Sequence, residues 1–321
     1  MREFIIQKND CHQRVDKFLG KAVKGLPKSL MYKYIRLKRI KVNGKRCEIS
    51  TILQEGDRLS LYINDEFFSS PQNPESSFLK APTALRIVYE DENILLIDKP
   101  PGLVVHEDNR QLADSLIDRV KHYLYEKGEY SPDDELSFAP ALCNRIDRNT
   151  GGIVIAAKNA ESLRIINEKI QQREIKKYYL CLNEGKVIPQ SAELHYYLKK
   201  DAASNKVSIQ EQPLDGYKEI VTFYRVIASD GKHSLTEVEL ATGRTHQIRA
   251  QMAYIGFPLV GDTKYGAKEK HKYHALYSYK LRFDFKTDAG ILNYLKGKIF
   301  EVPDIWFAKE INTEEKGTSD R

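Results

Sequence analysis

The fold of this chain is decided by the stretch Asn144-Arg-Ile-Asp147-Arg-Asn-Thr-Gly-Gly152, which leads directly into the apolar segment Ile153-Val-Ile-Ala-Ala157. This junction predicts a polar turn that carries one carboxylate, Asp147, at the start of a buried strand. Further along, Thr242-Gly-Arg244-Thr-His-Gln-Ile-Arg249 places a guanidinium, Arg244, in a glycine turn that opens a helix. A lone aspartate in a turn is usually a cap or a turn former. The arginine in the second turn makes Asp147 a candidate for chemistry as well.

Three further segments belong with these two. They are Ile94-Leu-Leu-Ile-Asp-Lys-Pro-Pro-Gly-Leu-Val-Val-His106, Ile175-Lys-Lys-Tyr-Tyr-Leu-Cys-Leu-Asn-Glu-Gly185 and Gly256-Phe-Pro-Leu-Val-Gly-Asp-Thr-Lys-Tyr-Gly266. In this order, over about residues 85–285, the motifs resemble the RluA family of RNA pseudouridine synthases, whose central motif reads approximately His-Arg-Leu-Asp-x-x-Thr-Ser-Gly.

The resemblance implies an isomerase that converts uridine to pseudouridine in RNA, with no cofactor. It assigns Asp147 as the catalytic carboxylate, and Tyr179 and Arg244 as the residues that complete the site. This chain departs from the family pattern at two positions, since Asn144 stands where His is usual and Gly151 where Ser is usual. These departures concern how the turn is braced, because neither position is the expected reacting group.

The reaction explains why these residue types are needed. A carboxylate that acts at the ribose, as nucleophile or as base, must be ionised, so a neighbouring cation should lower its pKa. Arg244 is our candidate, because a guanidinium can bind a carboxylate through two parallel hydrogen bonds. An aromatic ring should support the detached base. Tyr179 is the expected platform and Tyr178 the alternative, and strand alternation allows only one of them to face the site.

Other polar residues in the motifs have two interpretations each. We assign Lys99, Arg145 and Arg249 to RNA binding, although Lys99 could equally cap its strand and Arg145 could steady the turn. His246 and Arg249 lie on the expected helix Thr245–Ile255, where an architectural or phosphate-facing role is favoured over direct chemistry. His106 follows a Pro-Pro-Gly turn and is expected to fix that loop.

Composition and cysteine spacing bound the class of protein. A chain of 321 residues with 41% hydrophobic and 30% charged residues is typical of a soluble globular protein. No apolar run reaches the roughly 18 residues of a membrane span, and the first residues lack a signal-peptide core, so we expect a cytoplasmic protein. The cysteines show no CxxC spacing, which argues against zinc and a disulfide framework. We interpret Cys143 as a spectator thiol, although it lies near Asp147 in the sequence.

Charge is concentrated at the N-terminal end. Residues 1–60 carry 15 Lys and Arg against 6 Asp and Glu, whereas the remainder carries 36 against 39. A small basic domain beside a near-neutral body suggests docking on a polyanion, with a solvated basic face as the alternative.

The pattern within this basic region predicts its fold. A helix over 14–24 with Val15, Phe18, Leu19 and Val23 on one face precedes a helix over 30–39 that Ser29 should cap and that should bury Leu30, Tyr34 and Leu37. Asn43-Gly44 predicts a hairpin turn. Two helices followed by this hairpin resemble the S4 RNA-binding domain. By that resemblance the exposed basic residues of the second helix contact RNA: Lys33, Arg36, Lys38 and Arg39.

Four segments follow from these patterns. We expect an S4-like domain (1–63), a linker (64–82) whose Phe67, Phe68 and Phe78 can dock on a surface, a catalytic domain (83–308) and a flexible tail (309–321). Strands are expected at 86–90, 93–98, 153–157, 178–182, 221–227 and 234–240. Helical patterns lie between them, at Leu112–Leu124 and Leu163–Ile170. Many strands with few helices predict an α+β fold with a mostly antiparallel mixed sheet.

Two other classes of function remain to be distinguished. One is a non-catalytic RNA-binding factor for ribosome assembly, and the other is a glycosidase or nucleoside hydrolase that uses Asp147. The second class normally needs two carboxylates around the bond, and no obvious partner lies near Asp147 in the sequence. We expect RNA as the partner, ribosomal RNA first and transfer RNA second, and a monomeric protein without a membrane or metal site.

Overall fold

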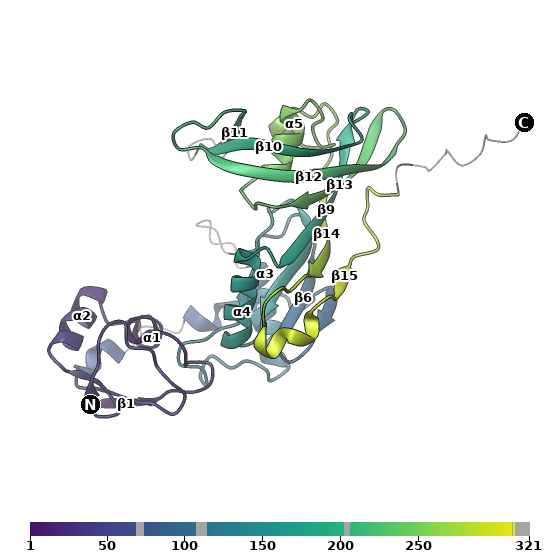
Figure 1. Cartoon of the computed structure of the whole chain (residues 1–321). Coiled ribbons are helices and arrows are strands. Elements are labelled where there is room, and N and C mark those ends of the chain that lie inside the picture. The colour runs from purple at the N-terminus through teal and green to yellow at the C-terminus, as the bar shows by residue number, and fades with distance from the viewer. Residues whose placement is uncertain (69–73, 107–113, 202–205, 310, 312–321) are drawn as a thin grey trace, which may run out of the picture.

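The structure is a computed structural model that describes residues 1–68, 74–106, 114–201, 206–309 and 311. In this part of the chain two separate β-sheets form an N-terminal domain and a large domain, which Figure 1 shows as two distinct bodies. Residues 310 and 312–321 of the predicted tail lie outside the described residues. The sheets divide the chain between Leu61 and Ile87, and the finer boundaries stay predictions. Within the described residues, none of the helices combines the length and apolarity needed to cross a membrane.

The N-terminal domain is a small α/β unit with an antiparallel sheet in the order β1-β4-β2-β3. Its elements are β1 (Arg2–Ile5), α1 (Val15–Ala22), α2 (Lys28–Arg36), β2 (Ile40–Val42), β3 (Lys45–Arg46) and β4 (Arg58–Leu61). Asn43 and Gly44 both have positive φ, 51° and 72°, as the two central residues of a type I′ hairpin turn require. The predicted hairpin is therefore confirmed.

The two helices bury apolar faces against this sheet. α1 buries Val15, Phe18 and Leu19 as predicted. The prediction for α2 was wrong in its start, because the helix begins at Lys28 after Pro27 and has no side-chain cap. The fixed φ of proline suits the beginning of a helix.

The buried face of α2 also differs in part from the prediction, although Tyr34 is buried as expected. Met31, Tyr34 and Ile35 are the buried residues, and Leu37 is 54% exposed instead of buried. The basic residues expected on the outer surface are all exposed: Lys33, Arg36, Lys38 and Arg39.

The linker is more structured than the sequence suggested. Two 3-10 helices occur in it, η1 (Asp65–Phe68) and η2 (Pro74–Lys80). Phe67 and Phe68 pack against the core of the N-terminal domain, whereas Phe78 is buried in the core of the large domain. Each end of the linker is thus attached to the domain that it adjoins, as its phenylalanines indicated.

The large domain is an eleven-stranded sheet with helices packed on it, within the part of the chain that the structure describes. The strand order is β11-β10-β12-β13-β9-β14-β8-β6-β5, with β15 on β14 and β7 on β8. All neighbours are antiparallel except β14 and β8. The strands are β5 (Ile87–Glu90), β6 (Ile94–Lys99), β7 (Ala141–Leu142), β8 (Gly151–Ala157), β9 (Ile175–Glu184), β10 (Ser191–Lys200), β11 (Val207–Gln210), β12 (Lys218–Ser229), β13 (His233–Leu240), β14 (Leu276–Phe283) and β15 (Ile299–Glu301).

The helices of this domain are α3 (Leu116–Glu126), α4 (Ala160–Gln171), α5 (Gln247–Tyr254), η3 (Thr263–Tyr265) and η4 (Gly290–Leu295). The predicted α+β class and all six predicted strands are confirmed. Leu112, the first residue of one predicted helical pattern, lies outside the described residues. The strands β7, β10, β11, β14 and β15 were missed, and β10 shows one reason, because most of its side chains remain partly exposed and polar.

Helices cover both faces of the central strands. Alternate residues of β6 and β8 pack towards α3 on one face, Leu95 and Val154 among them. The intervening residues, such as Ile153, pack with Ile166 of α4 in the largest core. α5 packs against another part of the same sheet, where Met252 contacts the cluster that contains Tyr179. The Asp147 turn (144–152), β9 and α5 therefore come together at one place.

The N-terminal domain also makes direct contacts with the large domain. The Asn9 side chain donates to Oε1 of Glu135 (2.6 Å) and accepts from the backbone N–H of Ala160 at the start of α4 (3.2 Å). Gln13 donates to Oγ of Ser137 (2.7 Å). The two domains are therefore connected both by the linker and by direct hydrogen bonds, which define their relative arrangement in this structure.

Candidate active site

The Asp147 turn is held in place by hydrogen bonds to the strand that follows it. Asn144 accepts from the backbone N–H of Ile155 (2.8 Å) and donates to the carbonyl of Ile153 (3.3 Å). The backbone N–H of Thr150 donates to the carbonyl of Asp147 (3.1 Å). An asparagine at the position usually held by histidine therefore braces the turn against β8, because its amide can both donate and accept.

The second departure from the family pattern has a steric explanation. A Cβ at Gly151 would lie 2.3 Å from Cε2 of Tyr277, so the ring of Tyr277 already fills the space that a serine would use. Gly152 has a φ of 115°, and a Cβ there would lie 2.2 Å from the carbonyl oxygen of Ser278. Both glycines thus allow β14 to approach the turn closely.

The carboxylate of Asp147 is paired with Arg249. Nη1 of Arg249 lies 3.0 Å from Oδ2 of Asp147, while its Nε and Nη2 bind the two carboxylate oxygens of Asp262 at 2.6 and 2.8 Å. Burial alone would lower the pKa of Arg249, but the bonds to Asp262 and the attraction of Asp147 raise it above its ordinary value. Arg249 is 7% exposed. Its donors are directed to two carboxylates, which favours the architectural role, and its expected contact with RNA stays a prediction.

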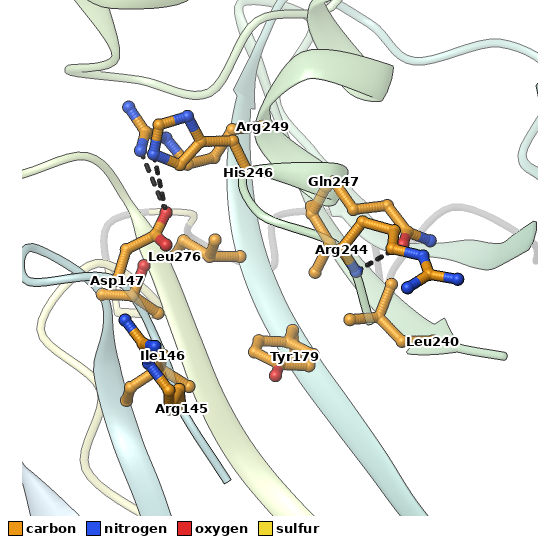
Figure 2. A pocket seen from close by; sticks show the side chains of 12 residues that line it. Arg145, Ile146, Asp147, Tyr179, Leu240, Arg244, His246, Gln247, Arg249 and Leu276 are labelled. Carbon is orange, nitrogen blue, oxygen red and sulfur yellow. Dashed lines mark hydrogen bonds and ion pairs between the residues drawn. The ribbon is translucent and has the colours of Figure 1, made fainter. Parts of the chain in front are cut away.

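Arg244 does not form the expected ion pair with Asp147 in this structure. Figure 2 shows its side chain directed away from the carboxylate, whereas that of Arg249 points at it. The cause is local, because Oε1 of Gln247 accepts hydrogen bonds from the backbone N–H of Arg244 (3.0 Å) and from Oγ1 of Thr242 (3.0 Å). These bonds fix the turn and leave Arg244 exposed at the edge of the same pocket.

His246 adds a neutral ring to this wall of the pocket. It has a left-handed backbone (φ 55°) at the start of α5, and its Nε2 lies 3.7 Å from Oδ2 of Asp147. Its Nδ1 is hydrogen-bonded to the hydroxyl of Tyr265 (2.7 Å). Burial, aided by the positive charge of Arg249, lowers the pKa of His246 to about 4 although Asp147 opposes this shift. At neutral pH the ring therefore carries no charge.

The side-chain direction of the two tyrosines answers the question that the sequence left open. Tyr179 lines the pocket and is 6% exposed, and Figure 2 shows its ring between the Asp147 turn and Leu240. Tyr178 lies on the opposite face of β9, with Nζ of Lys280 4.5 Å from its ring centroid. Burial raises the pKa of Tyr179 to about 12, and the negative charge of Asp147 acts in the same direction.

The rest of the pocket lining is largely apolar. Ile146, Leu240, Ile248 and Leu276 surround the ring of Tyr179. A planar, partly apolar ligand with polar edges suits such a lining, with the carboxylate of Asp147 on one side and the arginines at the pocket edge around it.

Lys99 has a structural position that the sequence did not reveal. It is fully buried, and its Nζ donates to the carbonyls of Pro100 (3.0 Å), Leu103 (2.8 Å) and Arg148 (3.0 Å). Burial lowers its pKa to about 7, with Asp147 acting in the opposite direction. These bonds agree with the strand-cap interpretation, since they hold carbonyls of the loop that follows β6, and the RNA contact stays a prediction. Lys99 ties the loop after β6 to the residue that follows Asp147.

Several residues of the site were not singled out from the sequence. Asp262 lies within a quoted motif, but only the fold shows that it binds Arg249. Nε2 of His274 is hydrogen-bonded to Oγ1 of Thr150 (2.9 Å) behind the Asp147 turn. Arg145 is exposed at the pocket edge, and its assignment to RNA binding stays a prediction. Burial lowers the pKa of His106, and the positive charge of the nearby Arg145 lowers it further.

The fold and the site define a class of protein. An ion-paired carboxylate faces an aromatic ring in a pocket partly lined by apolar side chains, and the same chain carries a small basic domain, as expected of an enzyme that modifies a base in RNA. Two family models support this conclusion. Residues 93–254 match the RNA pseudouridylate synthase family, and residues 13–59 match the S4 domain. The chain belongs to the RNA pseudouridylate synthase family and is an RNA pseudouridine synthase, an isomerase with an RNA-binding S4 domain.

Individual relatives agree with this assignment. An uncharacterized RNA pseudouridine synthase of Mycoplasma capricolum is 31% identical over 96% of this chain and 100% of its own length. The ribosomal large subunit pseudouridine synthase D of Pseudomonas aeruginosa is 31% identical over 80% of this chain and 74% of its own. Among solved structures, human RNA pseudouridylate synthase domain containing 1 shares the fold, with a TM-score of 0.54 and 19% identity over 74% of this chain and 86% of that one.

Proposed function

We propose that this chain isomerises uridine to pseudouridine in large-subunit ribosomal RNA, with Asp147 as the reacting carboxylate. The observation that carries the proposal is the position of Asp147, which is held by Arg249 and faces the pocket that Tyr179 lines. The relative in Pseudomonas aeruginosa is named for the large ribosomal subunit, which favours ribosomal RNA over transfer RNA as substrate.

The reaction breaks the bond between N1 of the base and C1′ of the ribose and forms a bond from C5 to C1′. N1 gains a proton and C5 loses one, so atoms and electrons balance within the nucleotide and the solvent. Asp147 would either attack C1′ or remove a proton from C2′, and both routes require it to be ionised. Arg249 serves this requirement, because a paired guanidinium favours the charged form of the carboxylate.

Tyr179 would support the base while it is detached. Its ring offers a flat apolar surface opposite the Asp147 turn, and a closed apolar site keeps water from the intermediate. His246, neutral at physiological pH, would add a polar ring beside the carboxylate without a competing charge.

The N-terminal domain would bind the RNA around the target. Its exposed cations and Arg145 at the pocket edge are the proposed contacts: Lys33, Arg36, Lys38, Arg39 and Arg145. Such phosphate contacts raise the local concentration of RNA in a salt-dependent manner. We propose further that the protein acts as a monomer in the cytoplasm, with transfer RNA as the second candidate substrate.

The test uses the full-length protein with unmodified transcripts of large-subunit ribosomal RNA and of transfer RNA. Carbodiimide-blocked primer extension should detect new pseudouridine at one or a few positions of the ribosomal transcript. The same positions should lose their signal in cells without the gene. Release of free uracil would indicate a hydrolase instead, and RNA binding without modification in either assay would indicate an assembly factor.

A further inference from the structure

Lys177 is a cation beside the pocket that the proposed reaction does not use. It lies on β9 two residues before Tyr179, and strand alternation places both side chains on the same face. A Cβ built on Gly243 would lie 3.8 Å from Nζ of Lys177. The ammonium group therefore lies next to the turn that carries Arg244.

The surroundings of Lys177 lack a counter-charge. Within the described part of the chain, its Nζ has no carboxylate within 4.0 Å and no hydrogen-bond acceptor, although the side chain is partly buried. Burial lowers its pKa, and no attraction to an acid offsets this shift. Its neighbour Lys176, on the opposite face, pairs with Glu239 at 3.0 Å. A partly buried cation without a partner is costly, so Lys177 is arranged for an anion from outside the chain.

Arg244 is the second cation at this position. The hydrogen bond from its backbone to Gln247 fixes the turn, and the side chain is exposed and directed away from Asp147 (Figure 2). No ion pair of its guanidinium occurs with the residues that the structure describes. Lys177 and Arg244 thus lie together at the side of the pocket opposite the carboxylate.

We propose that Lys177 and Arg244 together bind a phosphodiester of the RNA backbone next to the uridine in the pocket. The inference rests on the proposed function, since a uridine that enters the pocket brings its own flanking phosphates to the opening. A guanidinium can bind two phosphate oxygens at once, and an ammonium adds a compact point charge. The bound phosphate would remain on the far side of the pocket from Asp147, which limits repulsion between the two anions.

Arg145 would contact the RNA from the other side of the opening, because it follows the strand that leads into the Asp147 turn. The two sides have different roles. Contacts at Lys177 and Arg244 fix the backbone of the target nucleotide itself, so they select how deeply the base enters. This selection depends on the backbone and is independent of base identity.

The experiment compares RNA affinity and single-turnover rate for Lys177→Met, Arg244→Gln and the double variant. Lys176→Met is the matched control, because it removes the same charge one residue away on the opposite face. Lys177→Arg retains the charge. A second arm uses unaltered protein and an RNA in which the phosphate on either side of the mapped target uridine is a neutral methylphosphonate.

The expected result is a loss of about tenfold or more in affinity for each single variant, as for one charge-assisted hydrogen bond to an ion. The salt slope of log affinity should fall by about 0.7 per lost contact to single-stranded RNA. The single-turnover rate at saturating RNA should change less than the affinity. Lys176→Met should match the unaltered protein, and Lys177→Arg should retain most of its affinity. Melting temperature should not fall in Lys177→Met, since it loses no partner within the chain.

One of the two methylphosphonate substitutions should weaken RNA binding by the unaltered protein. The same substitution should not weaken RNA binding by the double variant any further. Equal affinity and salt slope for Lys177→Met and the unaltered protein would overturn the inference, as would indifference to both methylphosphonates. A protein that binds RNA with these contacts but forms no pseudouridine would contradict the proposed function and leave the phosphate site supported.

Discussion

The inner wall of the pocket and its rim both carry charged side chains, but they differ in whether these side chains have partners within the chain. The inner wall consists of Asp147, Arg249, Asp262 and His246, and the rim consists of Arg145, Lys177 and Arg244. On the inner wall, Arg249 has bonds to both aspartates within the folded chain. On the rim, the structure shows no acidic partner for the cations within the described residues. The inner wall is thus complete within the folded chain, whereas we propose that the RNA completes the rim.

Two arginines of one segment illustrate this difference. Arg249 lies on α5 and points inward, whereas Arg244 lies in the turn before it and points outward. His246, with its left-handed backbone at the start of α5, lies between them. A preorganised ion pair stabilises the reacting state without reorganisation during the reaction, while an unpaired surface cation contributes to binding.

The largest expected effect comes from the inner wall. Asp147→Asn keeps the size of the side chain and removes its charge, so isomerisation should fall by more than about 10⁴-fold, as for other lost nucleophiles or their bases. RNA affinity should change little, because the rim and the N-terminal domain remain intact. Tritium release from RNA labelled at uridine C5 measures the rate. Substantial turnover by this variant would show that Asp147 is not the reacting carboxylate, and the inner wall would then have no distinct part in the reaction.

Tyr179 tests how the base is supported between wall and rim. Tyr179→Ala should weaken binding of the target uridine by about 1–3 kcal/mol, the contribution of one stacked base. Tyr179→Phe should retain this binding. Because the pKa of Tyr179 is raised to about 12, its hydroxyl stays protonated over pH 6–9 and should add no titration to the rate profile. Tyr178→Ala is the control on the opposite face. A greater loss of binding in Tyr178→Ala than in Tyr179→Ala would show that Tyr178, and not Tyr179, supports the base.

The histidine behind the Asp147 turn links this wall to pH. His274 is 4% exposed, and burial, aided by Arg249, lowers its pKa from 6.5 to about 4. Between these pH values the unfolded chain binds more protons than the folded one, so stability falls as pH drops through this window. His274→Gln should lessen that fall by roughly 3 kcal/mol, at about 1.4 kcal/mol per pKa unit.

Urea unfolding at pH 7 and pH 4.5 measures this effect. Equal pH dependence of His274→Gln and the unaltered protein would contradict the proposed neutral state of this ring.

The smallest expected effect on the isomerisation rate comes from the N-terminal domain. Replacing Lys33, Arg36, Lys38 and Arg39 with Gln should weaken binding to long ribosomal fragments and lower the salt slope by up to about 0.9 per phosphate contact. The single-turnover rate at saturating RNA should be preserved. Salt titrations of affinity provide the measurement. Lys296→Gln and Lys298→Gln, exposed on the large domain, are the control, and an equal loss per charge there would show that the basic face has no special part in binding.

Local sequence predicted the parts of the fold that burial determines. Strands such as β8 are buried on both faces and therefore read as continuous apolar runs. The alternation of side chains along β9 meant that only one of the two candidate rings, Tyr178 or Tyr179, could face the site. The hairpin at Asn43-Gly44 follows from two residues that tolerate positive φ.

What the sequence could not predict depends on contacts between distant segments. Arg244 and Arg249 are equivalent as residue types, and the fold of this segment, with its bonds to Gln247 and the left-handed backbone at His246, decides which one reaches Asp147. The role of Lys99 requires a carbonyl from Arg148, which belongs to another loop. The contact between Asn9 and Glu135 likewise joins two domains with no local signal in either segment.

The two arginines also provide the most direct test of the central claim, that Arg249 holds the reacting carboxylate while Arg244 binds RNA. The measurement is the single-turnover isomerisation rate at saturating RNA, with affinity determined in parallel, for Arg249→Met and Arg244→Met. Arg249→Met should lose at least about 10²–10³-fold in rate, as for the loss of one preorganised electrostatic contact. Arg244→Met should keep its rate within a few-fold and lose affinity. A collapse of the rate in Arg244→Met, with Arg249→Met nearly unaffected, would contradict the account.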